Sequence, residues 1–445
     1  MRFPLLDFSI TNHFRKLGDT MFKKIKGRFA ERKTQKERTV ISYEDMPLED
    51  YEQEKTEMSP KAVKKIIIGV LIALGVGLIV FAIANREKLT WDNITIWWNY
   101  EVLGTAGKGY PVNVVGSEVE SGNFAINQGR VAYASDTSFI TLNSTGREIC
   151  NSQLRYTKPV MKAAGNRFLA FGLGEQGFQV QKFDKKLYSG TAENAIFAGD
   201  IASNGRYCIV TEGNGFYSEL FAYDKNNNRI FKYSFSEYYI NTVAINKKGT
   251  GCVACGISNN NGEMKTGVYV LDFSKKEPKA TYEIEGDYIL DSKYISTNRV
   301  ALVGGSASYV VKVDDKIIKK VEYGGMPLEN YCFNPSTHTF SLALSQSGDG
   351  RSCALITYND GGGQNSRVNS EYGCDSLSTY KGTIATLDGN MIYAYSGGKL
   401  KYSCYAGTGS KRMILNSGSE AFVLSVNQVR KIDLTRRSSP DSAKK

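Results

Sequence analysis

Cysteine and histidine are the residues of this chain with the widest chemical range. The 445 residues include eight cysteines and two histidines, His13 and His338. Cys252 and Cys255 have the spacing of half a zinc site, but the sequence offers no second pair to complete four ligands. They also fall inside a predicted strand, where positions three apart face opposite sides. We therefore predict no metal site, and we interpret His338, which lies at a turn before an apolar strand, as a surface residue.

Paired carboxylates could hydrolyse a glycosidic bond as an acid and a base. The candidates are Asp314, Asp315 and Asp349, and their places in predicted hairpin turns favour a structural role. Gly361 to Gly363 lack the following lysine and helix that a phosphate-binding loop needs. The sequence thus offers no catalytic, cofactor-binding or metal-binding residue, and we expect a protein that is not an enzyme.

Apart from His13, the residues considered above lie within a weakly repeated sequence pattern, which indicates the fold that positions them. A turn, often an arginine, and a short apolar run recur eight times, at Arg130, Arg167, Arg206, Thr250, Arg299, Thr339, Thr383 and Glu420. A second strand, which usually ends in Asp or Asn, and then a third strand follow each run. Spacings of roughly 37 to 49 residues are typical of β-propeller blades rather than of helical repeats. We predict an all-β propeller over residues 110–434 with eight blades, or seven if the weak repeat at Thr339 or Glu420 is not a full blade.

The first and last segments of the predicted propeller indicate how the ring closes. The eighth repeat has no strand after Asp433, and residues 110–115 form a strand-like segment outside any repeat. We predict that this segment supplies the outer strand of the last blade. Such a closure removes the exposed edges that an open array of sheets would carry.

The propeller prediction also bears on the cysteines, which are Cys150, Cys208, Cys252, Cys255, Cys332, Cys353, Cys374 and Cys404. An even number of cysteines in an oxidising compartment invites disulfides. However, Cys208 and Cys252 occupy equivalent positions in consecutive blades, and sheets pack about 10 Å apart. A disulfide needs Cα atoms within about 7 Å. We expect most of the thiols to be small buried residues.

The repeat at residues 129–149, GRVAYASDTSFITLNSTGREI, resembles the pyrroloquinoline-quinone type of propeller repeat. The chain as a whole resembles an uncharacterised bacterial family of single-pass, membrane-anchored propellers, a domain of unknown function. The resemblance implies a propeller fold over residues 110–434. Quinone binding is not implied, because the repeats lack the tryptophan and the adjacent cysteine pair of the quinone enzymes.

Residues 66–84 are predicted to cross a membrane. The 19 residues contain no charge and, as a helix, would span about 28 Å of hydrocarbon. Lys61, Lys64 and Lys65 precede the segment, so the positive-inside rule places the N-terminus in the cytoplasm and the propeller outside the cell membrane. A cleaved signal peptide is the alternative, but 65 residues precede the apolar run.

The segments around the span complete the domain assignment. Residues 85–109 are interpreted as a juxtamembrane stalk, with Trp91, Trp97 and Trp98 as interfacial anchors. Residues 1–65 form the predicted cytoplasmic tail. Within it, residues 10–31 read as a basic amphipathic segment, which would bind anionic lipid or a cytoplasmic partner, or be simply solvated. Residues 44–57 read as an acidic linker, and residues 435–445 as a disordered basic tail.

Composition limits the remaining function classes. The net charge of +11 is not concentrated on one element, so we expect no nucleic-acid partner. We expect an extracytoplasmic binding or scaffold module for envelope proteins or wall polymer. The alternative is a polysaccharide hydrolase or lyase that uses loop carboxylates. Three or more carboxylates around the central opening would favour the alternative, whereas Ser, Asn and Tyr would favour the binding module.

Overall fold

The computed structural model describes residues 60–84, 89–260, 262–313, 317–348 and 350–436, and the chain divides into two units after Ile83. The predicted segments 10–31 and 44–57 lie outside the described residues. So do most of residues 435–445 and the side chains of Asp314, Asp315 and Asp349.

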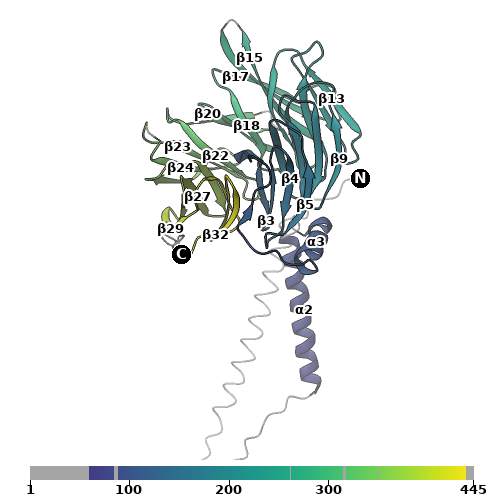
Figure 1. Ribbon diagram of the computed structural model, residues 1–445, viewed down its shortest axis with the longest axis vertical. Coiled ribbons are helices and arrows are strands. Elements are labelled where there is room, and N and C mark those ends of the chain that lie inside the picture. The colour runs from purple at the N-terminus through teal and green to yellow at the C-terminus, as the bar shows by residue number, and fades with distance from the viewer. Residues whose placement is uncertain (1–59, 85–88, 261, 314–316, 349, 437–445) are drawn as a thin grey trace, which may run out of the picture. The chain divides into compact units, whose positions relative to one another are not determined.

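One long apolar helix, α2, runs from Pro60 to Ala84 (Figure 1). Proline suits the first helical position, because its missing N–H would have no partner there. The segment Lys64–Phe81 is long and apolar enough to cross a membrane, by length and composition, and none of it is buried.

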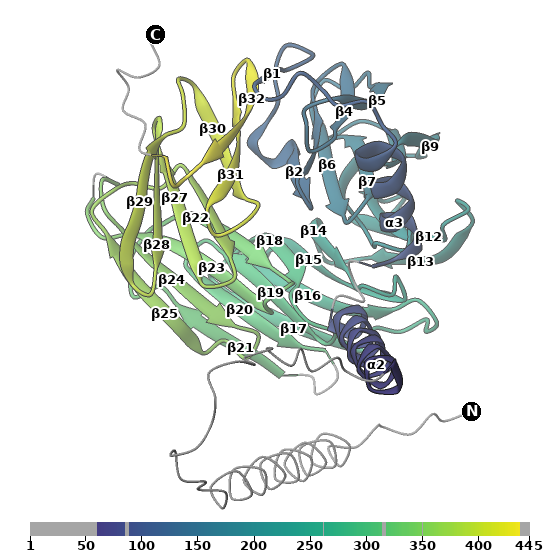
Figure 2. The ribbon, with the colours of Figure 1, turned by 90° about the horizontal axis from the view of Figure 1, so that it is seen from below.

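The second unit contains a ring of eight four-stranded antiparallel sheets (Figure 2), which confirms eight blades rather than seven. From the channel outward, the blades are: blade 1, β2 (Phe124–Asn127), β3 (Arg130–Ala134), β4 (Ser138–Leu142), β5 (Glu148–Gln153); blade 2, β6 (Pro159–Ala164), β7 (Arg167–Gly172), β8 (Gly177–Lys182), β9 (Lys185–Thr191); blade 3, β10 (Ile196–Ile201), β11 (Tyr207–Glu212), β12 (Ser218–Tyr223), β13 (Arg229–Phe235); blade 4, β14 (Tyr239–Ile245), β15 (Gly251–Asn260), β16 (Glu263–Asp272), β17 (Ala280–Glu285); blade 5, β18 (Ile289–Tyr294), β19 (Arg299–Gly304), β20 (Ala307–Lys312), β21 (Ile317–Glu322); blade 6, β22 (Leu328–Asn334), β23 (Thr339–Ser345), β24 (Cys353–Asn359), β25 (Gln364–Ser370); blade 7, β26 (Ser376–Tyr380), β27 (Thr383–Asp388), β28 (Met391–Ser396), β29 (Lys399–Tyr405); blade 8, β30 (Ser410–Leu415), β31 (Glu420–Ser425), β32 (Gln428–Asp433) and β1 (Val112–Asn113).

Apolar clusters between neighbouring blades hold the ring together. Every gap between two successive blades contains one buried cluster, including the gap between blades 8 and 1. Together, the second strands of the blades contribute the most buried residues to the clusters on both faces of their sheets. One of these strands, β23, is buried along its whole length. This burial explains why the sequence runs of these strands are continuously apolar rather than alternating. Each fully buried large side chain, such as Phe422, contributes about 1.5–3 kcal/mol.

The ring closes as the sequence predicts. β1 pairs antiparallel with β32, so that Val112 lies opposite Val429 and Asn113 opposite Gln428. The last blade therefore combines the first and last strands of the propeller. Val429 is fully buried in the cluster between blades 8 and 1.

The three strands that the sequence indicates in each repeat are the second, third and fourth strands of a blade. Each blade has an additional first strand beside the channel. These strands carry charged or polar residues, such as Lys162, Asp291 and Arg412, in positions that interrupt an apolar run. A strand that faces the channel along part of its length does not need a continuous apolar sequence.

Residues 89–109 pack on the propeller through a short helix, α3 (Trp91–Trp97), and a π-helical turn, η1 (Trp98–Val102). Ile96 is 1% exposed in the cluster between blades 1 and 2. Asp92 forms ion pairs with Arg167 at 2.8 Å and with Lys182 at 3.4 Å. These contacts attach α3 to the turns at one end of blades 1 and 2.

Candidate binding face of the propeller

The ring has two ends with different loops, because neighbouring strands of every blade are antiparallel. The turns between first and second strands and between third and fourth strands lie at one end, where α3 packs. We call this end the α3 face. The turns between second and third strands and the connections between blades lie at the other end, which we call the inter-blade face.

Exposed large apolar side chains gather on the inter-blade face of blades 3 to 5. We call them the aromatic patch, and each is between 38% and 55% exposed: Phe197, Phe216, Tyr217, Tyr239, Tyr288 and Leu290. The rings of Tyr217 and Tyr239 meet edge to face, with centroids 4.6 Å apart. A group of exposed aromatic side chains on a folded domain is typical of a surface that binds a partner.

Backbone bulges position two members of the patch. The register of β10 against β11 shifts between Ile196 and Ala198, and that of β18 against β19 shifts between Ile289 and Asp291. Phe197 and Leu290 are the extra residues at these shifts. A bulged residue leaves the regular alternation of the ladder, so both side chains are exposed beside the channel rather than paired within the sheet.

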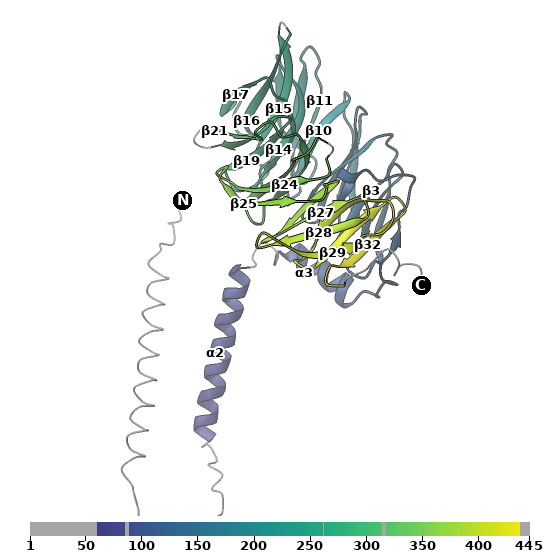
Figure 3. The same cartoon turned by 90° about the vertical axis from the view of Figure 1, so that its left-hand side faces the viewer.

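Blade 4 extends the inter-blade face outward. Its central hairpin, β15 and β16, is ten residues long on each side and projects beyond the neighbouring blades (Figures 1 and 3). Ile257 and Met264 on this hairpin are 37% and 38% exposed. The hairpin therefore adds apolar surface to the same face as the aromatic patch.

Carboxylates border the aromatic patch. The exposed acidic residues in the loops and strand ends around it are Glu193, Glu212, Glu237 and Glu285. Within blade 4, Tyr238 donates a hydrogen bond to Glu283 at 2.9 Å, and Lys265 pairs with Glu283 at 2.7 Å. Burial, reinforced by Glu283, raises the pKa of Tyr238 to about 12, so its hydroxyl stays protonated. Such a border favours a partner that presents cationic as well as apolar groups.

The central channel contains charged residues in matched pairs. Lys162 of blade 2 lies 3.6 Å from Asp291 of blade 5, and Lys293 lies 3.1 Å from Asp200 of blade 3. Tyr331 also donates to Asp291, at 3.4 Å. The Asp291 carboxylate raises the pKa of Lys162. A lysine and a carboxylate in contact attract each other across the channel, which suits bracing of the ring.

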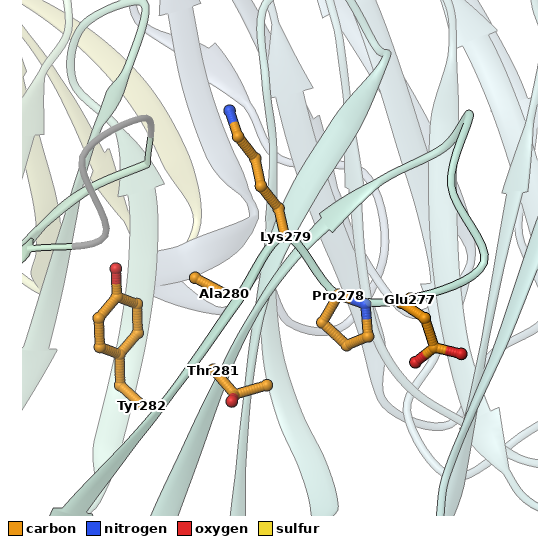
Figure 4. Close-up of a pocket in the computed structure, with 6 residues that line it drawn as sticks. All are labelled: Glu277, Pro278, Lys279, Ala280, Thr281 and Tyr282. Carbon is orange, nitrogen blue, oxygen red and sulfur yellow. The ribbon is translucent and has the colours of Figure 1, made fainter.

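A hollow of about 420 Å³ lies along β17, lined by Glu277–Tyr282 (Figure 4). All of its lining residues come from one stretch of the outer strand of blade 4 and the turn before it. Glu277 contributes the only carboxylate of the lining. The hollow therefore brings no groups together from different elements, and we assign it no role.

The structure places the other sequence candidates apart from one another. Cys252 and Cys255 lie in clusters on opposite faces of blade 4, as predicted. His338 is exposed in the turn before β23, and its Nδ1 bonds the Ile295 carbonyl oxygen at 2.9 Å. Asn359 accepts hydrogen bonds from the N–H groups of Gly361 and Gly363, which form a hairpin turn.

The thiols are mostly buried, as the sequence predicts. All eight cysteines are free, and Cys332 alone is half-buried rather than buried. Cys208 and Cys252 belong to one buried cluster between blades 3 and 4, which also contains small side chains such as Ala222 and Ala254.

Sequence reasoning missed the aromatic patch. Tyr217, Tyr239 and Tyr288 belong to different blades and are tens of residues apart in the chain, so no local motif contains them. The available signal was the abundance of tyrosine, 27 residues in all. Among the described residues, no three His, Cys, Asp or Glu side chains gather where they could hold a metal ion.

One comparison with known proteins gives a match. No curated protein matches the chain. One family model matches residues 110–434, from two residues before β1 to the residue after β32, which is most of the chain and the whole ring. This chain therefore belongs to the family of unknown function DUF5711.

Proposed function

We propose that this chain is a membrane-anchored, extracytoplasmic binding or scaffold module that does not catalyse a reaction. The inter-blade face would bind an envelope protein or a wall polymer, and α2 would anchor the chain in the cell membrane. The positive charges of Lys61, Lys64 and Lys65, which precede the apolar segment within α2, support a cytoplasmic N-terminus and an external propeller.

The aromatic patch is the observation that carries the proposal. Exposing six large apolar side chains on one face has no benefit for the stability of the isolated domain. It does provide contact area for a partner, because aromatic side chains contribute much of the binding energy at interfaces. Polar residues of the channel mouth, such as the exposed Asn241, suit recognition more than hydrolysis.

Photo-crosslinking in cells tests the proposal directly. A photoreactive phenylalanine derivative replaces Tyr217 or Tyr239 in the full chain, and the matched control replaces Leu400. Leu400 is 45% exposed but lies on β29, the outer strand of blade 7. We expect a discrete adduct from positions 217 and 239 and none from 400. Equal adducts at all three positions, or none, would contradict the proposal.

The same cells test catalysis and location. If the chain released soluble fragments from wall glycan without any adduct at the patch, the hydrolase or lyase alternative would replace the binding module. For location, external protease added to intact cells should digest the propeller and leave the residues before α2. Digestion of the N-terminal residues with the propeller intact would reverse the proposed topology.

A further inference from the structure

The α3 face carries positive charge and exposed tryptophan. We infer that this face lies against an anionic lipid bilayer, held by the tryptophans of α3 and η1 and by the lysines and arginines of the surrounding turns. The inference rests on the proposed membrane anchoring and adds an orientation to it. The inter-blade face, with its aromatic patch, would then point away from the membrane.

The tryptophans are the first observation. Trp91 is 81% exposed, while Trp97 and Trp98 are 51% and 50% exposed. Ile96 on the same helix is buried against the propeller, so α3 has one face on the ring and another in solvent. Tryptophan is enriched where lipid headgroups meet hydrocarbon, because its large ring is apolar and its N–H donates to water or headgroups.

The second observation is the charge of the turns on the α3 face. Blades 1 to 4, 7 and 8 present exposed basic residues there: Arg147, Lys185, Lys186, Lys225, Arg229, Lys247, Lys248, Lys275, Lys276, Lys381, Lys399 and Arg436. Exposed acidic residues are fewer at these turns, where they are Glu148, Glu277 and Asp433.

On the opposite face, exposed acidic residues outnumber the exposed basic residues of the loops, which are Arg155, Lys158 and Arg351. Exposed acidic residues of the inter-blade face are Glu118, Glu120, Glu193, Glu212, Glu237, Glu263, Glu285, Glu322, Glu329, Glu371 and Asp375. An anionic membrane attracts nearby basic side chains and repels acidic ones over about a Debye length. The propeller therefore has a preferred orientation at such a surface, with the α3 face toward the lipid.

The length of the chain between α2 and α3 is consistent with this contact. Residues 85–90 separate the last residue of α2 from Trp91. The seven Cα–Cα steps from Ala84 to Trp91 reach at most about 25 Å when fully extended. If α2 crosses a bilayer, Trp91 cannot lie farther than that from the end of the helix. A second copy of the chain is a poorer occupant, because two α3 faces would bring like charges together.

Tryptophan fluorescence gives a specific test, because all three tryptophans of the chain lie in α3 and η1. The full chain is reconstituted into vesicles of phosphatidylcholine with phosphatidylglycerol, in which the phosphatidylcholine is brominated at a shallow or a deep acyl position. We expect stronger quenching by the shallow bromines. We also expect the quenching to weaken in high salt and in vesicles of phosphatidylcholine alone, because screening and loss of anionic lipid remove the attraction.

Charge reversal in blade 2 offers a matched pair of variants. Lys185→Glu with Lys186→Glu reverses two exposed charges on the α3 face. The control, Arg155→Glu with Lys158→Glu, reverses two exposed charges in the connection between β5 and β6, on the inter-blade face. The first pair of substitutions should lower, by about tenfold, the ratio of chains whose α3 face is bound to lipid to chains whose α3 face is released. The control pair should leave the quenching unchanged or slightly stronger.

Each outcome has one meaning. Absence of quenching, or equal loss in both variant pairs, overturns the inference. Absence of quenching together with a doubled mass of the solubilised chain assigns the face to a second copy instead. Adducts at positions 217 and 239 that persist without lipid quenching would keep the binding module and remove only the orientation.

Discussion

Lys162 of β6 and Asp291 of β18 meet across the central channel, with Nζ 3.6 Å from Oδ1. The two residues belong to blades 2 and 5, which share no apolar cluster. The ion pair therefore links parts of the ring that the packing between neighbouring blades does not connect.

Removing one partner of this pair should lower the stability of the propeller. Lys162→Met leaves Asp291 without its lysine in a half-buried channel, and we expect a loss of about 1 kcal/mol after solvent screening. Thermal unfolding of the detergent-solubilised chain measures the effect. Lys320→Met is the control, because its pair with Glu322 is largely exposed. Equal losses in both variants would show that the channel pair has no special role.

A disulfide between β1 and β32 should stabilise the ring. Asn113 lies opposite Gln428, and Gln428 Nε2 donates to Asn113 Oδ1 at 3.2 Å. Asn113→Cys with Gln428→Cys would covalently join the first and last strands and restrict the unfolded chain, which adds about 2–4 kcal/mol. The unfolding temperature should rise in the oxidised double variant and return to the parent value with reductant. No change on oxidation would mean that this strand pair does not limit unfolding.

The attachment of α3 to the propeller should depend on Ile96 and not on Ile94. Ile96→Asp places a charge in the cluster between blades 1 and 2, whereas Ile94 is 37% exposed on the same helix. We expect the first substitution to release α3, because an unpaired buried charge is costly. Hydrogen exchange over residues 91–102 should accelerate in Ile96→Asp and stay near the parent rate in Ile94→Asp. Similar rates in both variants would argue against the docking of α3.

Stability should fall in alkaline solution. Burial raises the pKa of the Cys353 and Cys404 thiols from 9.0 to about 11. Burial likewise raises the pKa of the Tyr133 and Tyr156 hydroxyls from 10.0 to about 12. Between these values the unfolded chain binds fewer protons than the folded chain, so the free energy of unfolding decreases as the pH rises. Urea unfolding midpoints should be level below about pH 8 and decline above pH 9; a level profile to pH 11 would contradict this.

The thiols should be protected in the folded chain. A thiolate is the reactive form. Burial raises the pKa of the thiols of Cys150, Cys252, Cys255, Cys332, Cys353, Cys374 and Cys404. Without reductant, a thiol reagent near neutral pH should react slowly with the folded chain and should count eight thiols after unfolding in urea. Fewer than eight would reveal a disulfide, and Cys208 with Cys252, which share one buried cluster, would be the first pair to examine.

The sequence predicts the parts of this fold that depend on local patterns. The second strands are buried on both faces, so their apolar runs stand out, and the leftover strand at residues 110–115 follows from counting repeats. The first strands were missed because residues such as Asp200 and Asp291 face the channel and interrupt the pattern. The bulges at Phe197 and Leu290 depend on pairing with a neighbouring strand, and no sequence motif marks them.

The pairing of β1 with β32 has a consequence for how the chain is made. Seven blades can form in order as the ribosome adds residues, but the eighth needs its last three strands before β1 has a partner. Until then, the apolar sides of blades 1 and 7 that later face blade 8 are uncovered. These transient surfaces are where a nascent chain would aggregate, and where a chaperone would bind to prevent it.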